Sequence, residues 1–131
     1  MGTALDKPLN GSRILVAEDD PVLAFDLVGL LMKAGARIAG PALSLERALE
    51  LADTEQLSCG VLDVQLRDGL VFPAARILLA KGAGIVFYTG QYDPEGLKRE
   101  WPDAQVLFKP APLDILMRAV VAACGAGLLR G

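Results

Sequence analysis

The sequence contains no histidine among its 131 residues. This absence removes the commonest general base and the commonest metal ligand of proteins. A metal site in this chain would therefore consist of oxygen ligands, which favour hard cations such as Mg²⁺. The basic residues are scattered and the formal net charge is −3. Nucleic acid is not expected as a partner, because neutralising its phosphates requires clustered Lys or Arg.

Cysteine is also scarce. Cys59 and Cys124 lie far apart in apolar stretches, and we interpret both as buried free thiols, which fits a reducing cytoplasm. The N-terminus lacks the basic and then apolar pattern of a signal peptide. The most apolar segment, 115–129, includes Arg118 and is shorter than the roughly 20 residues that cross a bilayer. We therefore predict a soluble cytoplasmic protein without membrane attachment.

The chain has the length of one domain, and 53% of its residues are apolar, which is enough for a core. Residues 1–11 lack periodicity, and we expect a flexible leader before a single domain over 12–128, without an output domain. Aspartates followed by Pro21 and Pro94 predict helix starts. The strands lack polar alternation, which indicates a parallel sheet covered on both faces. We expect strands at 13–17, 36–40, 59–63, 85–88 and 105–108, and helices at 21–34, 45–54, 70–81, 94–100 and from 113 to 123 or beyond.

Polar residues mark the ends of four of these strands. Glu18 and Asp19 follow the first strand, Asp63 ends the third, Thr89 follows the fourth and Lys109 follows the fifth. The carboxyl ends of parallel strands lie along one edge of the sheet, where ligands bind. Three carboxylates that meet there repel one another and require a divalent cation. We therefore predict a Mg²⁺ site at this edge.

The same residues suit phosphoryl transfer to an aspartate. Asp63 needs no base, because a carboxylate is already ionised at neutral pH and can attack a phosphoryl group. The metal and Lys109 would neutralise charge on the phosphoryl oxygens, and Thr89 could donate a hydrogen bond to the attached phosphate. Neither GxGxxG nor GxxxxGK[ST] occurs, so the sequence does not support a nucleotide-binding loop.

Together these motifs resemble a CheY-like response-regulator receiver domain over about residues 13–123. The resemblance implies a doubly wound (βα)5 flavodoxin-like fold with a five-stranded parallel sheet in the order 2-1-3-4-5. It also implies Mg²⁺-dependent transfer of a phosphoryl group from a histidine kinase or phosphotransferase to Asp63. The matching segments are Ile14-Leu15-Val16-Ala17-Glu18-Asp19-Asp20-Pro21, Val61-Leu62-Asp63, Tyr88-Thr89-Gly90 and Phe108-Lys109-Pro110.

The resemblance further assigns individual roles. By the match, Asp19 is the main direct metal ligand, Glu18 acts largely through water, and the backbone carbonyl of Gln65 completes the protein ligands. The peptide bond between Lys109 and Pro110 is typically cis in this family, and proline makes that isomer accessible.

A narrower resemblance involves Phe87-Tyr88-Thr89-Gly90-Gln91-Tyr92. This segment is similar to the Phe-Ala-Thr-Gly-x-Tyr pattern of an atypical receiver group, often single-domain and paired with kinases of the HWE or a related type. Tyr88 departs from the usual Ala. Val106 stands where receivers usually have a switch aromatic, and Ala111 stands where Phe often follows Lys-Pro. Tyr92 is a candidate replacement for the switch aromatic, with simple packing as the alternative.

The first and last helices have more apolar residues than one buried face requires. We hypothesise that the excess forms a surface for a kinase helical bundle or for a homodimer, since exposed apolar patches mark interfaces. Scattered exposed apolar residues are the alternative. The predicted inward residues are Leu23, Leu27, Leu30, Leu31 and Ala34 in the first helix and Leu113, Leu116, Val120 and Ala123 in the last. The predicted outward residues are Phe25, Val28, Met32, Ile115, Val121 and Ala122.

The sequence thus predicts a phosphorelay receiver that signals through protein–protein contacts. It is not expected to be an enzyme beyond promoting its own phosphorylation and dephosphorylation. One alternative is a pseudo-receiver, which binds proteins without being phosphorylated. Another is an aspartate-dependent phosphatase, in which a second acid would usually stand at the position of Gln65.

Overall fold

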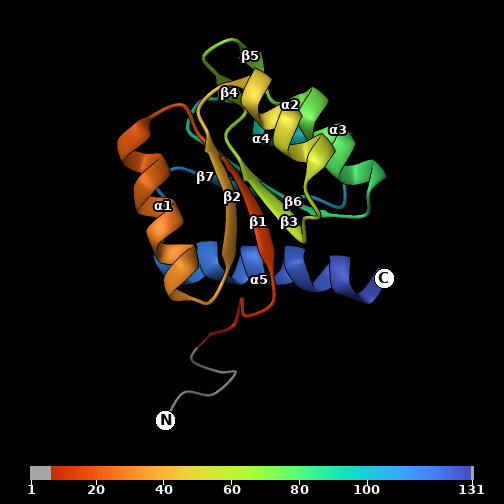
Figure 1. Ribbon diagram of the computed structural model, residues 1–131. Coiled ribbons are helices and arrows are strands. Elements are labelled where there is room, and N and C mark those ends of the chain that lie inside the picture. Colours follow the sequence, from red (N-terminus) through yellow and green to blue (C-terminus); the bar gives the residue numbers. More distant parts are fainter. Residues whose placement is uncertain (1–6, 131) are drawn as a thin grey trace.

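The structure, a computed structural model, describes the backbone of residues 7–130 and the side chains of residues 7–125. A central sheet contains β1 (Arg13–Ala17), β2 (Arg37–Ala42), β3 (Cys59–Leu62), β6 (Gly84–Thr89) and β7 (Gln105–Phe108). All five strands are parallel and follow the order β2-β1-β3-β6-β7 (Figure 1). Counted as the five main strands, this is the predicted order 2-1-3-4-5, and the α/β flavodoxin-like fold is confirmed.

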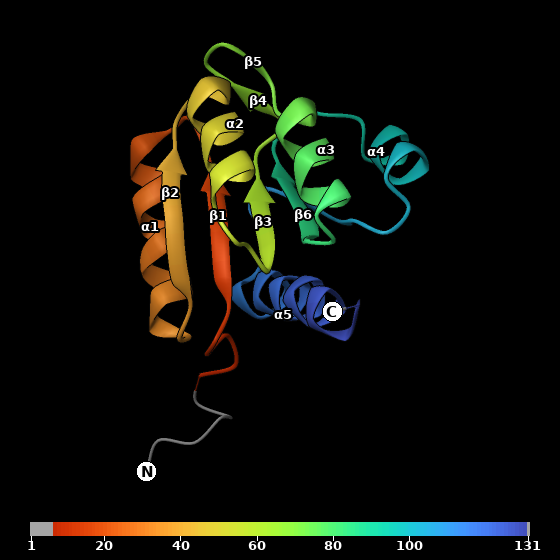
Figure 2. The ribbon, with the colours of Figure 1, turned by 45° about the vertical axis from the view of Figure 1, so that its right-hand side comes forward.

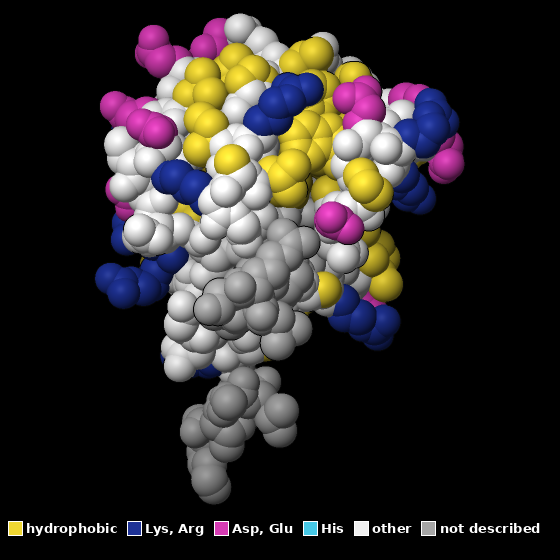
Figure 3. Space-filling view, turned by 90° about the vertical axis from the view of Figure 1, so that its right-hand side faces the viewer, with side chains coloured by type: hydrophobic (Ala, Val, Ile, Leu, Met, Phe, Trp, Pro, Cys, Tyr) yellow, Lys and Arg dark blue, Asp and Glu magenta, His cyan; other side chains and the backbone are white. Residues whose placement is uncertain are grey.

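Helices cover both faces of the sheet (Figures 1 and 2). One face carries α1 (Pro21–Lys33) and α5 (Leu113–Arg130), and the other carries α2 (Leu45–Thr54), α3 (Phe72–Ala80) and α4 (Pro94–Glu100). Each face has its own apolar cluster, which explains why the strands show no polar alternation. In Figure 3, hydrophobic side chains gather in the upper part of the face that carries α2 and α3.

The start of α1 is set by its predicted cap. The carboxylate of Asp20 accepts the backbone N–H groups of Val22 and Leu23, and Pro21 occupies the first turn. Asp93 and Pro94 act in the same way at α4. These caps satisfy amides that have no partner within the helix.

The second strand is longer than predicted. We expected it to end at Gly40, before Pro41, but β2 continues to Ala42, whose carbonyl accepts the N–H of Glu18 at 2.9 Å. Because β2 lies at the edge of the sheet, a proline there removes no essential ladder hydrogen bond.

The predicted helix start at residue 70 is wrong, and α3 begins at Phe72. The preceding residues form a two-stranded antiparallel hairpin of β4 (Gln65–Leu66) and β5 (Gly69–Leu70). In its turn, Asp68 accepts the N–H groups of Leu45 and Glu46 at 2.5 and 3.1 Å. The hairpin therefore caps α2, which lies more than twenty residues earlier in the chain.

The predicted inward and outward faces of α1 and α5 are only partly correct. Val28 and Val121, expected outside, are half-buried against the core, whereas Leu23, Leu30 and Leu113, expected inside, are exposed. The helical period defines which residues share a face, but packing decides how that face is rotated toward the sheet. The remaining outward residues are exposed as predicted, namely Phe25, Met32, Ile115 and Ala122.

The segment before β1 is described from Lys7 onward, and residues 1–6 of the expected leader lie outside the described part. Leu9 is buried, and its N–H donates to the carbonyl of Ala34 at 2.9 Å. Cys59 and Cys124 are free and buried, as predicted. Among the helices over 7–130, none combines the length and hydropathy that crossing a membrane requires.

Candidate functional site

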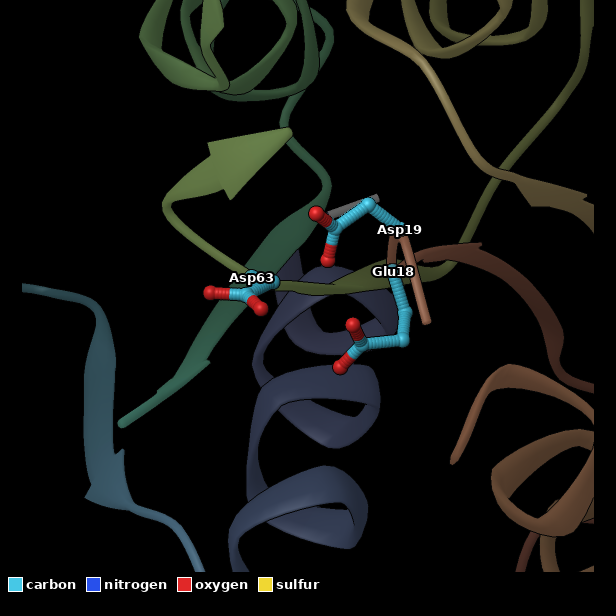
Figure 4. Close-up of side chains that lie close together, drawn as sticks. All are labelled: Glu18, Asp19 and Asp63. Atoms are coloured by element: carbon cyan, nitrogen blue, oxygen red, sulfur yellow. The ribbon is translucent and has the colours of Figure 1, made fainter. Parts of the chain in front are cut away.

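The candidate site lies where the strands end. Glu18 and Asp19 follow β1, and Asp63 follows β3. The N–H of Asp63 donates to the carbonyl of Ala17 at 2.9 Å, which holds the two strand ends side by side. The three carboxylates converge on one space (Figure 4), with an oxygen of each within 4.8 Å of the others.

Lys109 joins this cluster from the end of β7. Its Nζ donates to Oδ2 of Asp63 at 2.8 Å and to Oε1 of Glu18. Its backbone N–H donates to the carbonyl of Thr89 at 2.9 Å, which places the lysine beside the end of β6. The Lys109–Pro110 peptide bond is cis, as expected. One ammonium group therefore contacts carboxylates from two separate strands.

Thr89 and Gln65 complete the set of predicted residues. Thr89 is the last residue of β6 and is buried, whereas Gln65 begins β4 and is exposed. Both line a hollow of about 270 Å³ together with the acidic cluster and Lys109. The structure thus gathers residues from four segments of the sequence at one hollow.

Burial changes the charge properties of the cluster. Only 3% of Glu18 is exposed, and this desolvation raises its pKa above the ordinary 4.5, although Lys109 and the N–H of Asp20 donate hydrogen bonds to it. Burial alone would lower the pKa of Lys109, but its hydrogen bonds to Asp63 and Glu18 outweigh that effect and raise it. Lys109 therefore stays positively charged over the physiological range.

The donor set fits a hard divalent cation. All three groups are carboxylates, which Mg²⁺ prefers over nitrogen or sulfur ligands. One ammonium group cannot balance three carboxylates, so the cluster keeps a net negative charge. The structure thus has an acidic cluster suited to Mg²⁺, as receiver domains typically have.

Tyr92 does not line this hollow. Its ring meets Phe72 edge-on, with the ring centres 5.6 Å apart, and packs against the cluster beneath α2, α3 and α4. Val106 packs against the same cluster. Tyr92 and Val106 therefore pack against the same apolar cluster, on the face of the sheet opposite α1.

Tyr88 also contacts the site, which its position in the sequence did not predict. Nζ of Lys109 lies 5.8 Å from the centre of its ring, and its hydroxyl accepts the N–H of Ala111 at 3.3 Å. Tyr88 therefore supports the segment that carries Lys109. Its replacement of the usual Ala was the only signal in the sequence, and that signal did not show which residues the ring would contact.

The sequence matches no family model. It is 31% identical over 112 residues to the transcriptional regulatory protein PdtaR of Mycobacterium tuberculosis. The match covers 82% of this chain and 54% of that protein. The chain therefore spans about half the length of the curated relatives it matches.

Solved structures show the same fold over nearly the whole chain. A response regulator receiver protein from Sinorhizobium medicae superimposes with a TM-score of 0.80 at 24% identity, covering 91% of this chain and 98% of its own. The non-phosphorylated HemR receiver domain from Leptospira biflexa gives a TM-score of 0.74 at 27% identity, covering 86% and 94%. The chain therefore has the fold of the response regulator receiver domains.

Proposed function

We propose that this chain is a two-component receiver that accepts a phosphoryl group from a histidine kinase or phosphotransferase on Asp63. The observation that carries the proposal is the 2.8 Å contact between Lys109 and Asp63 within an acidic cluster at the strand ends. A buried salt bridge is weak support for stability, so a role in chemistry explains it better.

The reaction needs few parts from the protein. An oxygen of Asp63 attacks the phosphorus of a phosphohistidine, the P–N bond breaks, and the imidazole leaves with the electron pair. Lys109 neutralises charge on the transferred group, and the Thr89 hydroxyl donates to one of its oxygens. Bound Mg²⁺, held by Glu18, Asp19, Asp63 and the backbone carbonyl of Gln65, would neutralise further charge. The product stays on the chain, so this is not turnover of an external substrate.

The proposal extends to the switch and the kinase. Tyr92 takes the role of the switch aromatic, supported by its packing on the same cluster as Val106 and by its position three residues after Thr89. The resemblance of residues 87–92 to the atypical group favours an HWE-type kinase. Two free buried thiols, Cys59 and Cys124, fit a reducing cytoplasm.

The test is Mg²⁺-dependent binding of beryllofluoride, which imitates a phosphoryl group, followed by ¹⁹F NMR. We expect binding in the unmodified chain and its loss in Asp63→Asn. Asp20→Asn is the matched control, because it removes a neighbouring charge while asparagine still caps α1. Binding that persists in Asp63→Asn would contradict Asp63 as the acceptor.

The pseudo-receiver is the second candidate, favoured by Val106 and Ala111 at positions where active receivers usually differ. It predicts no beryllofluoride binding in the unmodified chain.

The phosphatase alternative predicts steady hydrolysis of p-nitrophenyl phosphate, which we do not expect with Gln65 in place of a second acid. Phosphotransfer from a panel of purified kinases would then identify the donor.

A further inference from the structure

The outer face of α1 has an apolar stripe that the fold leaves uncovered. Val22, Phe25 and Met32 are 69%, 63% and 57% exposed. With Gly29 they follow one another at spacings of three, four and three residues. This spacing matches the contact positions of a two-helix coiled coil. The core side of α1, at Leu27 and Leu31, lies on the opposite face of the helix.

Gly29 lies in the middle of this stripe, and no contact within the described chain requires glycine at this position. Glycine lowers helix stability relative to alanine, and the backbone here needs no positive φ. A Cβ at this position would meet no described atom within 4 Å. A shallow hollow surrounds it, lined by Phe25, Asp26, Gly29, Leu30, Met32 and Lys33. A glycine in such a place allows another backbone to approach closely.

The charged residues beside the stripe could pair with the same residues of a second copy of the chain. By helical geometry, Asp26 and Lys33 border one edge of the stripe, and Phe25 and Met32 border the other. If a second α1 lies antiparallel across a two-fold axis near Gly29, Asp26 faces Lys33 of the second copy. Phe25 then lies beside Met32 of the second copy, a favourable contact between sulfur and an aromatic ring.

We propose that the outer face of α1 is the interface of a homodimer, with two antiparallel α1 helices crossing at Gly29. A two-fold interface requires one surface that complements itself, and the stripe and its charges meet that requirement. A helix of 13 residues is about 20 Å long. The interface would be smaller than the roughly 1,600 Å² of a stable complex, so the dimer should be weak and concentration-dependent.

The first test is sedimentation velocity of the unmodified chain from low micromolar to several hundred micromolar. We expect a reversible shift from monomer to dimer. Asp26→Lys and Lys33→Asp should each weaken association at least tenfold, and combining them should restore it, because the antiparallel arrangement pairs these positions across the axis. Reversing Glu95 and Lys98 on α4 in the same way is the control and should change nothing.

Gly29→Ala is the second test. It should raise the melting temperature of the monomer, since alanine favours the helix, and weaken the dimer several-fold, since the methyl group separates the two backbones. These opposite effects separate an interface from a purely structural role. A chain that stays monomeric at every concentration would overturn the proposal and leave the face to another protein, such as a kinase helix. A dimer indifferent to Asp26, Lys33 and Gly29 would overturn it as well. Neither measurement depends on phosphorylation of Asp63.

Discussion

Lys109 is expected to contribute both to the proposed phosphoryl transfer and to the stability of the site. Its ammonium group contacts Asp63 and Glu18, and the aromatic ring of Tyr88 lies 5.8 Å away. It is the positive group among three converging carboxylates. Removing its charge should therefore affect both the transfer of the phosphoryl group and the stability of the unliganded protein.

We predict that Lys109→Met slows phosphorylation of Asp63 by a small donor such as acetyl phosphate by about 100-fold, the effect typical of losing one charge-stabilising donor. Rates can be followed by Phos-tag gels or mass spectrometry. The same change at Lys98, an exposed lysine on α4, should have no effect. An unchanged rate in Lys109→Met would exclude Lys109 from the reaction.

We predict that Glu18 makes the affinity of the acidic cluster for Mg²⁺ depend on pH. Burial raises its pKa above 4.5, so the carboxyl group of Glu18 binds a proton more tightly in the folded chain than in the unfolded chain. Its contribution to stability is therefore full below pH 4.5 and is lost as the pH rises through the raised pKa. Mg²⁺ requires the ionised form, so its affinity should increase over that same window.

Isothermal titration calorimetry at pH 5 and pH 7 checks this prediction. We expect tighter Mg²⁺ binding at pH 7, accompanied by the release of fewer protons from the protein than at pH 5. In Glu18→Gln the pH dependence of Mg²⁺ binding should flatten. A dependence of equal size in both proteins would show that Glu18 is not responsible.

At the scale of elements, β6 and α5 pack without space for a side chain at Gly84. A Cβ there would overlap the backbone carbonyl of Ala123. Backbone atoms in a helix cannot move aside as a flexible side chain can, so the contact demands glycine.

Gly84→Ala should therefore lower the free energy of unfolding by about 2 kcal/mol, as overpacking does. Urea denaturation would measure this. Gly29→Ala, studied at low protein concentration, is the matched control, because a Cβ there meets no described atom within 4 Å. Equal stability of Gly84→Ala and the unmodified chain would mean that α5 shifts freely on the sheet.

The hairpin of β4 and β5 also stabilises a contact between separate elements. Asp68, in the turn of the hairpin, accepts the N–H groups of Leu45 and Glu46. These hydrogen bonds lower the pKa of Asp68, and the bond from Leu45 has the largest effect. A carboxyl with a lowered pKa stabilises the fold above its unfolded pKa of about 3.9, and this contribution is lost as the pH falls below that value.

We predict that Asp68→Ala lowers the urea midpoint at pH 7 and that the difference from the unmodified protein shrinks toward pH 3. Asp53→Ala, an exposed change on α2, is the control. A pH-independent difference would mean that the charge of Asp68 does not contribute.

At the scale of the molecule, three carboxylates from the ends of two strands meet at one edge of the sheet. A ligand that binds only the folded chain stabilises it by about 1.4 kcal/mol at ten times its Kd. Mg²⁺ should therefore raise the melting temperature of the unmodified chain. Asp19→Asn should lose most of this shift in a thermal denaturation assay. A shift of equal size in Asp19→Asn would place Mg²⁺ elsewhere.

Much of this architecture could be predicted from local patterns. Short apolar runs and the caps at Asp20 and Asp93 predicted the five main strands and the helices between them. Parallel strands have a common carboxyl edge, so the meeting of Glu18, Asp19, Asp63 and Lys109 followed from the order of elements. The roles of these residues in phosphoryl transfer remain predictions.

The errors occur where contacts between distant segments decide the outcome. The hairpin before α3 depends on Asp68 reaching the start of α2, and no local pattern indicates that bond. Val28 is half-buried and Leu23 is exposed because α1 is rotated by its packing on the sheet edge. Tyr88 contacts Lys109 only once β6 and β7 lie side by side.

By itself, the sequence determined the alternation of strands and helices and the polar residues at four of the five strand ends, because these depend on periodicity, caps and chain order. Only the tertiary structure decided the rotation of α1 and α5, the cap from Asp68 and the support of Lys109 by Tyr88. Those features depend on distances between side chains that lie tens of residues apart, and such distances exist only after the sheet has assembled.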